Sequence, residues 1–256
     1  MTPHYSPIDL SFYADAVLDE LVSGEPQIDG SILLDLARRA QGPILELGCG
    51  YGRITVPLAL RGVTGLTGLD LSAPSLAYAR QRSRDLYIRW VEADVRDYHL
   101  DARFAFIFAR GDVFNFMLTR ADQEAMLARV REHLADGGQF LFDSMPIRPN
   151  HMIDELEETA WYTIDHPNGR VIHVSGTDHY DHIRQWYIQN GTERWDSPNG
   201  ELVRPPWQLT LRYILPRDLE ALLHYNGFEV VERYSDFDGS PITQEEPGYV
   251  YLCRKR

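Results

Sequence analysis

The chain has 256 residues, of which 44% are hydrophobic, so it is long enough for one globular domain with an insertion or for two small domains. A formal net charge of −13 argues against a nucleic-acid partner, because such a partner normally requires a basic surface. Its two cysteines, Cys49 and Cys253, are far apart, which favours a reduced, cytoplasmic protein without disulfides. Neither a membrane-spanning run nor a signal peptide is expected from the sequence, so we predict no membrane partner.

The first predicted element is an amphipathic helix over Ser11–Val22. Ser11 is its expected N-cap, Val17 lies on the apolar face, and Asp19 lies on the solvent face. A second helix is expected over Ser31–Ala40. Both helices precede the first predicted strand.

The stretch Ile44–Thr55 reads ILELGCGYGRIT: a hydrophobic strand, three glycines at alternate positions, and the start of a helix. A glycine turn between a strand and a helix is typical of nucleotide-binding sites, because the backbone can approach a ligand closely. The spacing matches neither the dinucleotide G-x-G-x-x-G motif nor the phosphate-binding loop. Glu46 lies two residues before the first glycine, and it favours a ligand that carries an ammonium group or ribose hydroxyls.

An acidic residue follows each of the next two predicted strands. Strand Val63–Leu69 ends at Asp70, about twenty residues past the glycines, where parallel sheets place an acid for ribose hydroxyls. Ser72 is the expected cap of the next helix. Strand Tyr87–Val91 is followed by Asp94. The alternative for both acids is a capping or solvated loop carboxylate.

The continuous hydrophobic run Phe104–Ala109 predicts a buried fourth strand. An amphipathic helix is expected over Ala121–Leu134, with Gly137 as the left-handed residue that ends it. Strand Gln139–Asp143 follows.

Between about residues 161 and 215 the pattern changes to β-strands that are rich in Trp, Tyr and His. Asn168-Gly169, Asn190-Gly191 and Asn199-Gly200 are predicted turns between these strands. We therefore predict an antiparallel insertion. Cross-strand packing explains most of its aromatic residues.

After the insertion, Pro216 is the expected first residue of the last helix. The last two strands are expected over Phe228–Tyr234 and Tyr249–Arg254. Their connection through Pro241 and Gly248 is short, which suits an antiparallel pair.

From Ile44 to Asp143 the glycine turn, the two acids and the helix–glycine–strand order resemble class I S-adenosylmethionine-dependent methyltransferases. The resemblance implies an α/β fold: a Rossmann-like seven-stranded, mostly parallel sheet with helices on both faces and an antiparallel insertion that forms a lid. Residues 1–41 are then helices that cover the cofactor, residues 42–150 and 216–256 form the cofactor domain, and residues 151–215 form the substrate lid.

The resemblance also implies S-adenosyl-L-methionine as the cofactor and names the residues around it. The expected cofactor contacts are Tyr13, Glu46, Gly48, Cys49, Gly50, Arg53, Asp70, Leu71, Ser75, Asp94, Val95, Arg110 and Gly111. For Tyr13, simple packing on an apolar face is an equal alternative. The expected substrate contacts are Asp112, Phe114, Asn115, Arg212 and Tyr213.

No catalytic base is assigned, and the candidates are Asp143, His173 and His179; no metal site is predicted. The implied function is methyl transfer by in-line displacement to a nitrogen or oxygen atom of a small molecule. The loop after the fourth strand lacks the [Asp/Asn/Ser]-Pro-Pro-aromatic motif of enzymes that methylate nucleic-acid bases. A non-catalytic S-adenosylmethionine-binding protein and, less favoured, an NAD(P)-dependent oxidoreductase are the alternatives. The sequence leaves open whether two copies of the chain form a homodimer through the insertion.

Overall fold

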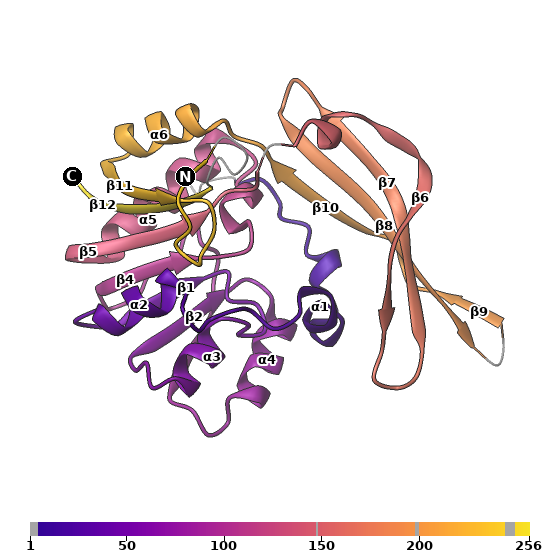
Figure 1. Cartoon of the computed structure of the whole chain (residues 1–256), viewed down its shortest axis with the longest axis horizontal. Coiled ribbons are helices and arrows are strands. Elements are labelled where there is room, and N and C mark those ends of the chain that lie inside the picture. Colours follow the sequence, from indigo (N-terminus) through magenta and orange to yellow (C-terminus); the bar gives the residue numbers. More distant parts are fainter. Residues whose placement is uncertain (1–4, 147, 198–199, 244–248) are drawn as a thin grey trace.

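The computed structural model describes residues 5–146, 148–197, 200–243 and 249–256. Within these residues the chain forms two sheets (Figure 1). The first has seven strands in the order β11-β12-β5-β4-β1-β2-β3, and the second is antiparallel, in the order β10-β8-β7-β6 with β9 beside β8. The fold class predicted from the sequence is confirmed.

The first sheet consists of β1 (Ile44–Leu47), β2 (Leu66–Asp70), β3 (Ile88–Glu92), β4 (Phe104–Ala109), β5 (Leu134–Asp143), β11 (Phe228–Tyr234) and β12 (Val250–Lys255). Strands β3, β2, β1, β4 and β5 are parallel, whereas β12 runs antiparallel to both β5 and β11. The last two strands therefore pair as predicted. Their connection includes Gly248, which lies outside the described residues.

Six α-helices and three short 3-10 helices accompany the strands in the described residues. They are η1 (Ser11–Tyr13), α1 (Ala16–Ser23), α2 (Ile32–Arg39), α3 (Thr55–Leu60), α4 (Ala73–Arg82), η2 (Val113–Phe116), α5 (Arg120–His133), η3 (Pro149–Met152) and α6 (Pro216–Tyr225). Two hydrophobic clusters hold helices against the first sheet. Leu127 of α5 belongs to one cluster and Leu33 of α2 to the other. Cys49 and Cys253 are both buried and free, as predicted.

Two predicted helix starts are confirmed and one is wrong. Ser72 caps α4, and Pro216 is the first residue of α6. Ser11 caps no α-helix, because the carboxylate of Asp15 accepts hydrogen bonds from the next backbone N–H groups and α1 begins after it. Val17, predicted on the apolar face, is 37% exposed, because Ala16 and Leu18 are the buried residues of this helix.

The predicted end of α5 is correct to within one residue, but the role predicted for Gly137 is wrong. The helix ends at His133, and Leu134 is already the extended first residue of β5. Gly137 does adopt a left-handed conformation, with φ of 73°. It lies inside β5, where the pairing register with β4 shifts between Phe104 and Phe106. Gly137 therefore accommodates the irregularity in β5 and does not end α5.

The second sheet is built from β6 (Glu155–Asp165), β7 (Val171–Asp181), β8 (Trp186–Ser197), β9 (Gly200–Val203) and β10 (Trp207–Arg212). The turn predicted at Gly169 joins β6 to β7. The turn predicted at Gly191 is wrong: this residue lies within β8, where a side chain would overlap the indole ring of Trp207. Asn199, in the third predicted turn, lies outside the described residues.

The N-terminal segment lies between the two sheets, with α1 visible between them in Figure 1. Leu18 of α1 packs in one hydrophobic cluster with Ile164 and Trp207 of the second sheet. The ring of Phe12 meets Trp207 edge-on at a centroid distance of 4.6 Å. The two sheets are thus joined through the first helices. Among the described residues, no helix is both long enough and apolar enough to cross a membrane.

Candidate functional site

The three glycines of the turn after β1 serve two different purposes. All have positive φ: 67° at Gly48, 50° at Gly50 and 80° at Gly52. An added Cβ would come within 2.5 Å of Val113 at Gly48 and within 2.7 Å of Trp90 at Gly52. At Gly50 it would meet nothing within 4 Å. Two glycines therefore allow close packing, while Gly50 leaves its side-chain space open to a ligand.

Asp70, at the end of β2, is tied to the glycine turn. Its Oδ2 accepts a 2.7 Å hydrogen bond from the backbone N–H of Gly50, and its Oδ1 accepts one of 2.7 Å from the N–H of Ser72. Burial raises the pKa of Asp70, although these N–H donors act in the opposite direction. The carboxylate is thus held at a fixed place beside the turn.

Glu46 belongs to β1, just before the turn, and is 2% exposed. Its Oε2 accepts hydrogen bonds from the backbone N–H of Thr55, at 3.0 Å, and from the Thr55 hydroxyl. Burial raises the pKa of Glu46 to about 8, despite these bonds. At neutral pH the group is therefore mostly protonated, and a cation bound nearby would favour its ionised form.

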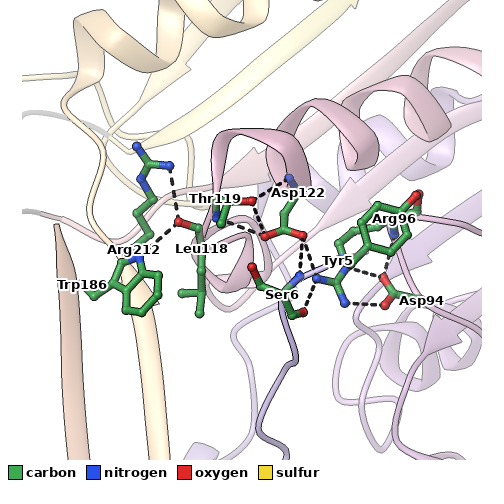
Figure 2. Close-up of polar contacts among 9 residues, drawn as sticks. All are labelled: Tyr5, Ser6, Asp94, Arg96, Leu118, Thr119, Asp122, Trp186 and Arg212. Atoms are coloured by element: carbon green, nitrogen blue, oxygen red, sulfur yellow. Dashed lines mark hydrogen bonds and ion pairs between the residues drawn. The ribbon is translucent and has the colours of Figure 1, made fainter. Parts of the chain in front are cut away.

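Asp94, after β3, is fixed by an arginine that the sequence analysis missed (Figure 2). Arg96 donates to both carboxylate oxygens of Asp94, at 2.9 and 2.6 Å. Its remaining Nη1 donates to the carbonyl of Ser6 and to Oδ1 of Asp122, and the ring of Tyr5 covers the guanidinium. The arginine therefore holds both Asp94 and the N-terminal segment in place.

The same region reaches the second sheet through the start of α5 (Figure 2). The carbonyl of Leu118 accepts hydrogen bonds from Trp186 Nε1, at 3.1 Å, and from Arg212 Nη1, at 3.4 Å. The amide of Asn115 donates to the carbonyl of Arg212 and accepts from the N–H of Met145. Asn115 and Arg212, both expected to contact substrate, therefore join the second sheet to the loop after β4.

One cavity opens at the carboxyl ends of the parallel strands, and all thirteen expected cofactor-contacting residues line it. Further residues that were not expected from the sequence also line it: Ile8, Leu10, Asp19, Ser23, Tyr51, Ile54, Ser72, Val113, Phe116 and Met117. The placement of Asp19 on the solvent face was wrong, because this residue of α1 lines the cavity. Burial raises the pKa of Asp19.

Arg110 carries a hydrogen-bond donor that is unsatisfied among the described residues. It lines the cavity, and its buried Nη1 has no hydrogen-bond partner among the described residues. The guanidinium carbon lies 4.4 Å from the ring centroid of Phe237. Burial lowers the pKa of this side chain. The cavity thus contains a guanidinium that can donate to a carboxylate, and carboxylates that can accept from hydroxyl and ammonium groups.

Two acids flank Gly111 at the edge of this cavity. Both oxygens of Asp143 accept from the N–H of Gly111, at 3.1 and 3.0 Å. Asp112 has a left-handed backbone, with φ of 62°, and its carboxylate has no partner among the residues described. Burial, followed by the charge of Asp143, raises the pKa of Asp112 to about 7. Asp143 thus shapes the loop, while Asp112 remains available.

None of the expected substrate and catalytic residues, Asp112 and Asp143 included, is among the residues that line the cavity. Phe114 is 1% exposed and packs against Phe142 in the core. His173 and His179 lie on β7 of the second sheet, and His179 contacts Asp154 at 3.0 Å. Their assignment to substrate or catalysis stays a prediction. In the part of the chain that is described, no group of three or more His, Cys, Asp or Glu residues is placed to hold a metal ion.

Comparisons with known proteins agree with this geometry. The family described as "Methyltransferase domain" matches residues 44–138, the segment from β1 to β5 that carries the glycine turn and both acids. This match and the similar proteins support the class I S-adenosylmethionine-dependent methyltransferase family that the sequence predicts. Its seven-stranded sheet is the Rossmann-like sheet of the similar methyltransferase structures. One structure with a similar fold, the glycopeptide N-methyltransferase MtfA, is 21% identical with a TM-score of 0.57 and was solved in complex with S-adenosylmethionine.

Three relatives of this methyltransferase have similar sequences or folds. YqeM of Bacillus subtilis (strain 168), named as a methyltransferase only provisionally, is 26% identical over 240 residues, which cover 90% of this chain and 92% of YqeM. The CcbJ methyltransferase of Streptomyces caelestis is 25% identical, with a TM-score of 0.75 and coverage of 96% and 99%. The dTDP-3-amino-3,6-dideoxy-alpha-D-glucopyranose N,N-dimethyltransferase of Streptomyces fradiae is 26% identical, covering 59% of this chain and 58% of that one.

Proposed function

We propose that this methyltransferase methylates a nitrogen or oxygen atom of a small molecule by in-line displacement, and that nitrogen is the preferred acceptor. When bound, S-adenosylmethionine supplies an electrophilic methyl group on a sulfonium. The observation that carries the preference is the unpartnered carboxylate of Asp112, which lies in the chain between the cavity-lining residues Gly111 and Val113. Hydroxyl and ammonium groups both donate hydrogen bonds to a carboxylate, but the charged ammonium is attracted more strongly.

The residues that line the cavity support a specific set of cofactor contacts. Asp70 suits the ribose hydroxyls, and Asp94 with Val95 suits the adenine. Glu46 favours the ammonium group, and the unpaired Nη1 of Arg110 suits the carboxylate of the same amino-acid end. These assignments follow from matching donors to acceptors.

Two further observations support a small amine as the acceptor. The Streptomyces fradiae relative is named for a dimethylation on nitrogen of an amino sugar. The loop after β4 carries Asp112 where enzymes that methylate nucleic-acid bases carry their Pro-Pro motif. The second sheet, joined to this loop through Asn115, would then cover the acceptor. A cytoplasmic location and a homodimer through this sheet stay predictions.

Two measurements test the proposal. Calorimetry with S-adenosylhomocysteine should detect binding at one site. Incubation with S-adenosylmethionine and a panel of dTDP-amino sugars, simple amines and matched hydroxyl compounds should then yield a product that is heavier by one or two methyl groups. Transfer to amines only is the expected result. Tight binding with no transfer to any amine or hydroxyl compound would favour the non-catalytic alternative.

A further inference from the structure

Asp19 differs from the other two acids at α1, because it has no cationic partner among the described residues. Asp15, the cap of the helix, lies 3.5 Å from the guanidinium of Arg204. Glu20 lies 2.7 Å from the guanidinium of Arg82 and is thereby neutralised. Asp19 forms no such pair, yet it lines the cofactor cavity. Its charge therefore remains available to a ligand in that cavity.

The end of α1 is attached to the glycine turn, and this attachment places Asp19. Arg53, which follows the turn, donates hydrogen bonds to the carbonyls of Ser23, at 3.2 Å, and Gly24, at 3.3 Å. The Ser23 hydroxyl in turn donates to Oδ1 of Asp19, at 2.9 Å. Oδ2 of Asp19 has no partner among the described residues. The carboxylate is thus held beside the turn with one oxygen free.

The surroundings of Asp19 favour a cation as its ligand. Burial raises the pKa of Asp19, whereas the hydrogen bond from Ser23 and the charge of Arg53 lower it. The other charged groups close to this carboxyl are Asp70 and Glu20, and both are acids. A bound cation would favour the ionised form of Asp19 and would be attracted by it.

The position beside the turn corresponds to the middle of the cofactor. Under the proposed function, the ribose hydroxyls lie at Asp70 and the ammonium group lies at Glu46. The sulfonium joins the ribose to the amino-acid end, so it lies between these two acids. Asp19 is tied to the same turn through Arg53, and all four side chains line one cavity. The sulfonium is therefore the cation that this placement suits.

Resting on the proposed function, we propose that Asp19 attracts the sulfonium and thereby favours S-adenosylmethionine over its product, S-adenosylhomocysteine. The two molecules differ only at sulfur, which is a methylated cation in the first and a neutral thioether in the second. Contacts with the adenine, ribose, ammonium and carboxylate groups are common to both and cannot distinguish them. A carboxylate beside the sulfur distinguishes them by charge, and it no longer attracts the sulfur once the methyl group has left.

The first test measures binding without an acceptor. The full-length protein is titrated calorimetrically with S-adenosylmethionine, with S-adenosylhomocysteine, and with sinefungin, which carries an amino group where the sulfonium would be. Asp19→Asn keeps the shape of the side chain and an oxygen for the Ser23 hydroxyl, so it removes the charge alone. It should weaken the binding of both cationic ligands by about 10-fold and that of S-adenosylhomocysteine by less than about 2-fold.

Glu25→Gln is the matched control, because it removes an exposed carboxylate just after α1. It should leave all three affinities unchanged. If Asp19→Asn weakens S-adenosylmethionine and S-adenosylhomocysteine equally, Asp19 binds a group that both share, and the sulfonium contact is overturned. Unchanged affinities would overturn it as well. If Asp19→Asn does not fold, Asp19→Ala is compared in the same way.

The second test uses the amine that the panel identifies and measures product inhibition. In Asp19→Asn the KM for S-adenosylmethionine should rise about 10-fold, while the inhibition constant of S-adenosylhomocysteine should stay nearly the same. A general disturbance of the site would raise both constants together and would overturn the inference. A wild-type protein that binds the cofactor but transfers no methyl group would overturn the proposed methyl transfer, and the calorimetric comparison would still decide the role of Asp19.

Discussion

The backbone N–H of Gly50 donates a 2.7 Å hydrogen bond to the carboxylate of Asp70, twenty residues further along the chain. This bond joins the turn after β1 to the end of β2, so the glycine that leaves room for a ligand and the acid that would bind it are placed together. The cavity is therefore shaped before any ligand arrives, which keeps the ordering cost of binding small.

Asp70→Ala should weaken the binding of S-adenosylhomocysteine by about 1–3 kcal/mol, because charge-assisted hydrogen bonds to the ribose hydroxyls are lost. Isothermal titration calorimetry measures this change directly. Asp35→Ala removes an exposed carboxylate on α2 and should leave the affinity unchanged. Equal affinities for Asp70→Ala and wild type would show that Asp70 does not contribute to cofactor binding.

The buried carboxyl of Glu46 predicts that cofactor binding releases a proton. Burial raises its pKa to about 8, so the group is mostly neutral at pH 7 in the free protein. A bound ammonium group would favour the ionised form, and the proton would leave. Calorimetry of S-adenosylhomocysteine binding in phosphate and in Tris buffer at pH 7 should give different apparent enthalpies. In Glu46→Gln the two enthalpies should agree, and agreement already in the wild type would refute the prediction.

How far the sequence predicts this site depends on the range of the interactions. The strand–turn–helix order and the acid after β2 are local patterns, and they predicted the residues around Gly50 correctly as neighbours in one cavity. Arg96 was missed because its partners, Ser6 and Asp122, lie 90 and 26 residues away in the chain. Asp19 was misplaced because Ala16 and Leu18, rather than Val17, are on the buried face of α1. Long-range pairing, and the choice between neighbouring faces of a short helix, leave little trace in sequence periodicity.

Arg96→Met should lower the free energy of unfolding by about 3–5 kcal/mol, because it leaves the buried carboxylate of Asp122 without its cation. Arg96 is 4% exposed and Asp122 is 1% exposed, so water does not replace the lost contact. Urea denaturation measures the change. Arg120→Met is the matched control: its ion pair with Glu124 is exposed, and the loss should be no more than about 0.5 kcal/mol. Similar losses in both variants would show that the buried network contributes little.

Asp112→Asn should make the fold more stable above pH 4 and should make the enzyme less active. The folded protein holds the pKa of Asp112 at about 7, whereas the unfolded chain ionises near the ordinary value of 3.8. Below pH 3.8 the carboxyl is neutral in both states and has no effect. As the pH rises from 3.8 through 7 the unfolded chain loses its proton first, so this group increasingly destabilises the fold. Asparagine is similar in shape and tolerates the left-handed backbone at this position.

The melting temperature of Asp112→Asn should therefore exceed that of the wild type at pH 8, and the difference should shrink as the pH approaches 4. Calorimetric scans at both pH values measure it, with Asp35→Asn on α2 as the exposed control that shows no such trend. The same variant should lose kcat/KM for the amine acceptor, because an amide attracts an ammonium group far less than a carboxylate does. If the variant is more stable at pH 8 but fully active, burial of Asp112 destabilises the fold as predicted, but Asp112 does not bind the acceptor.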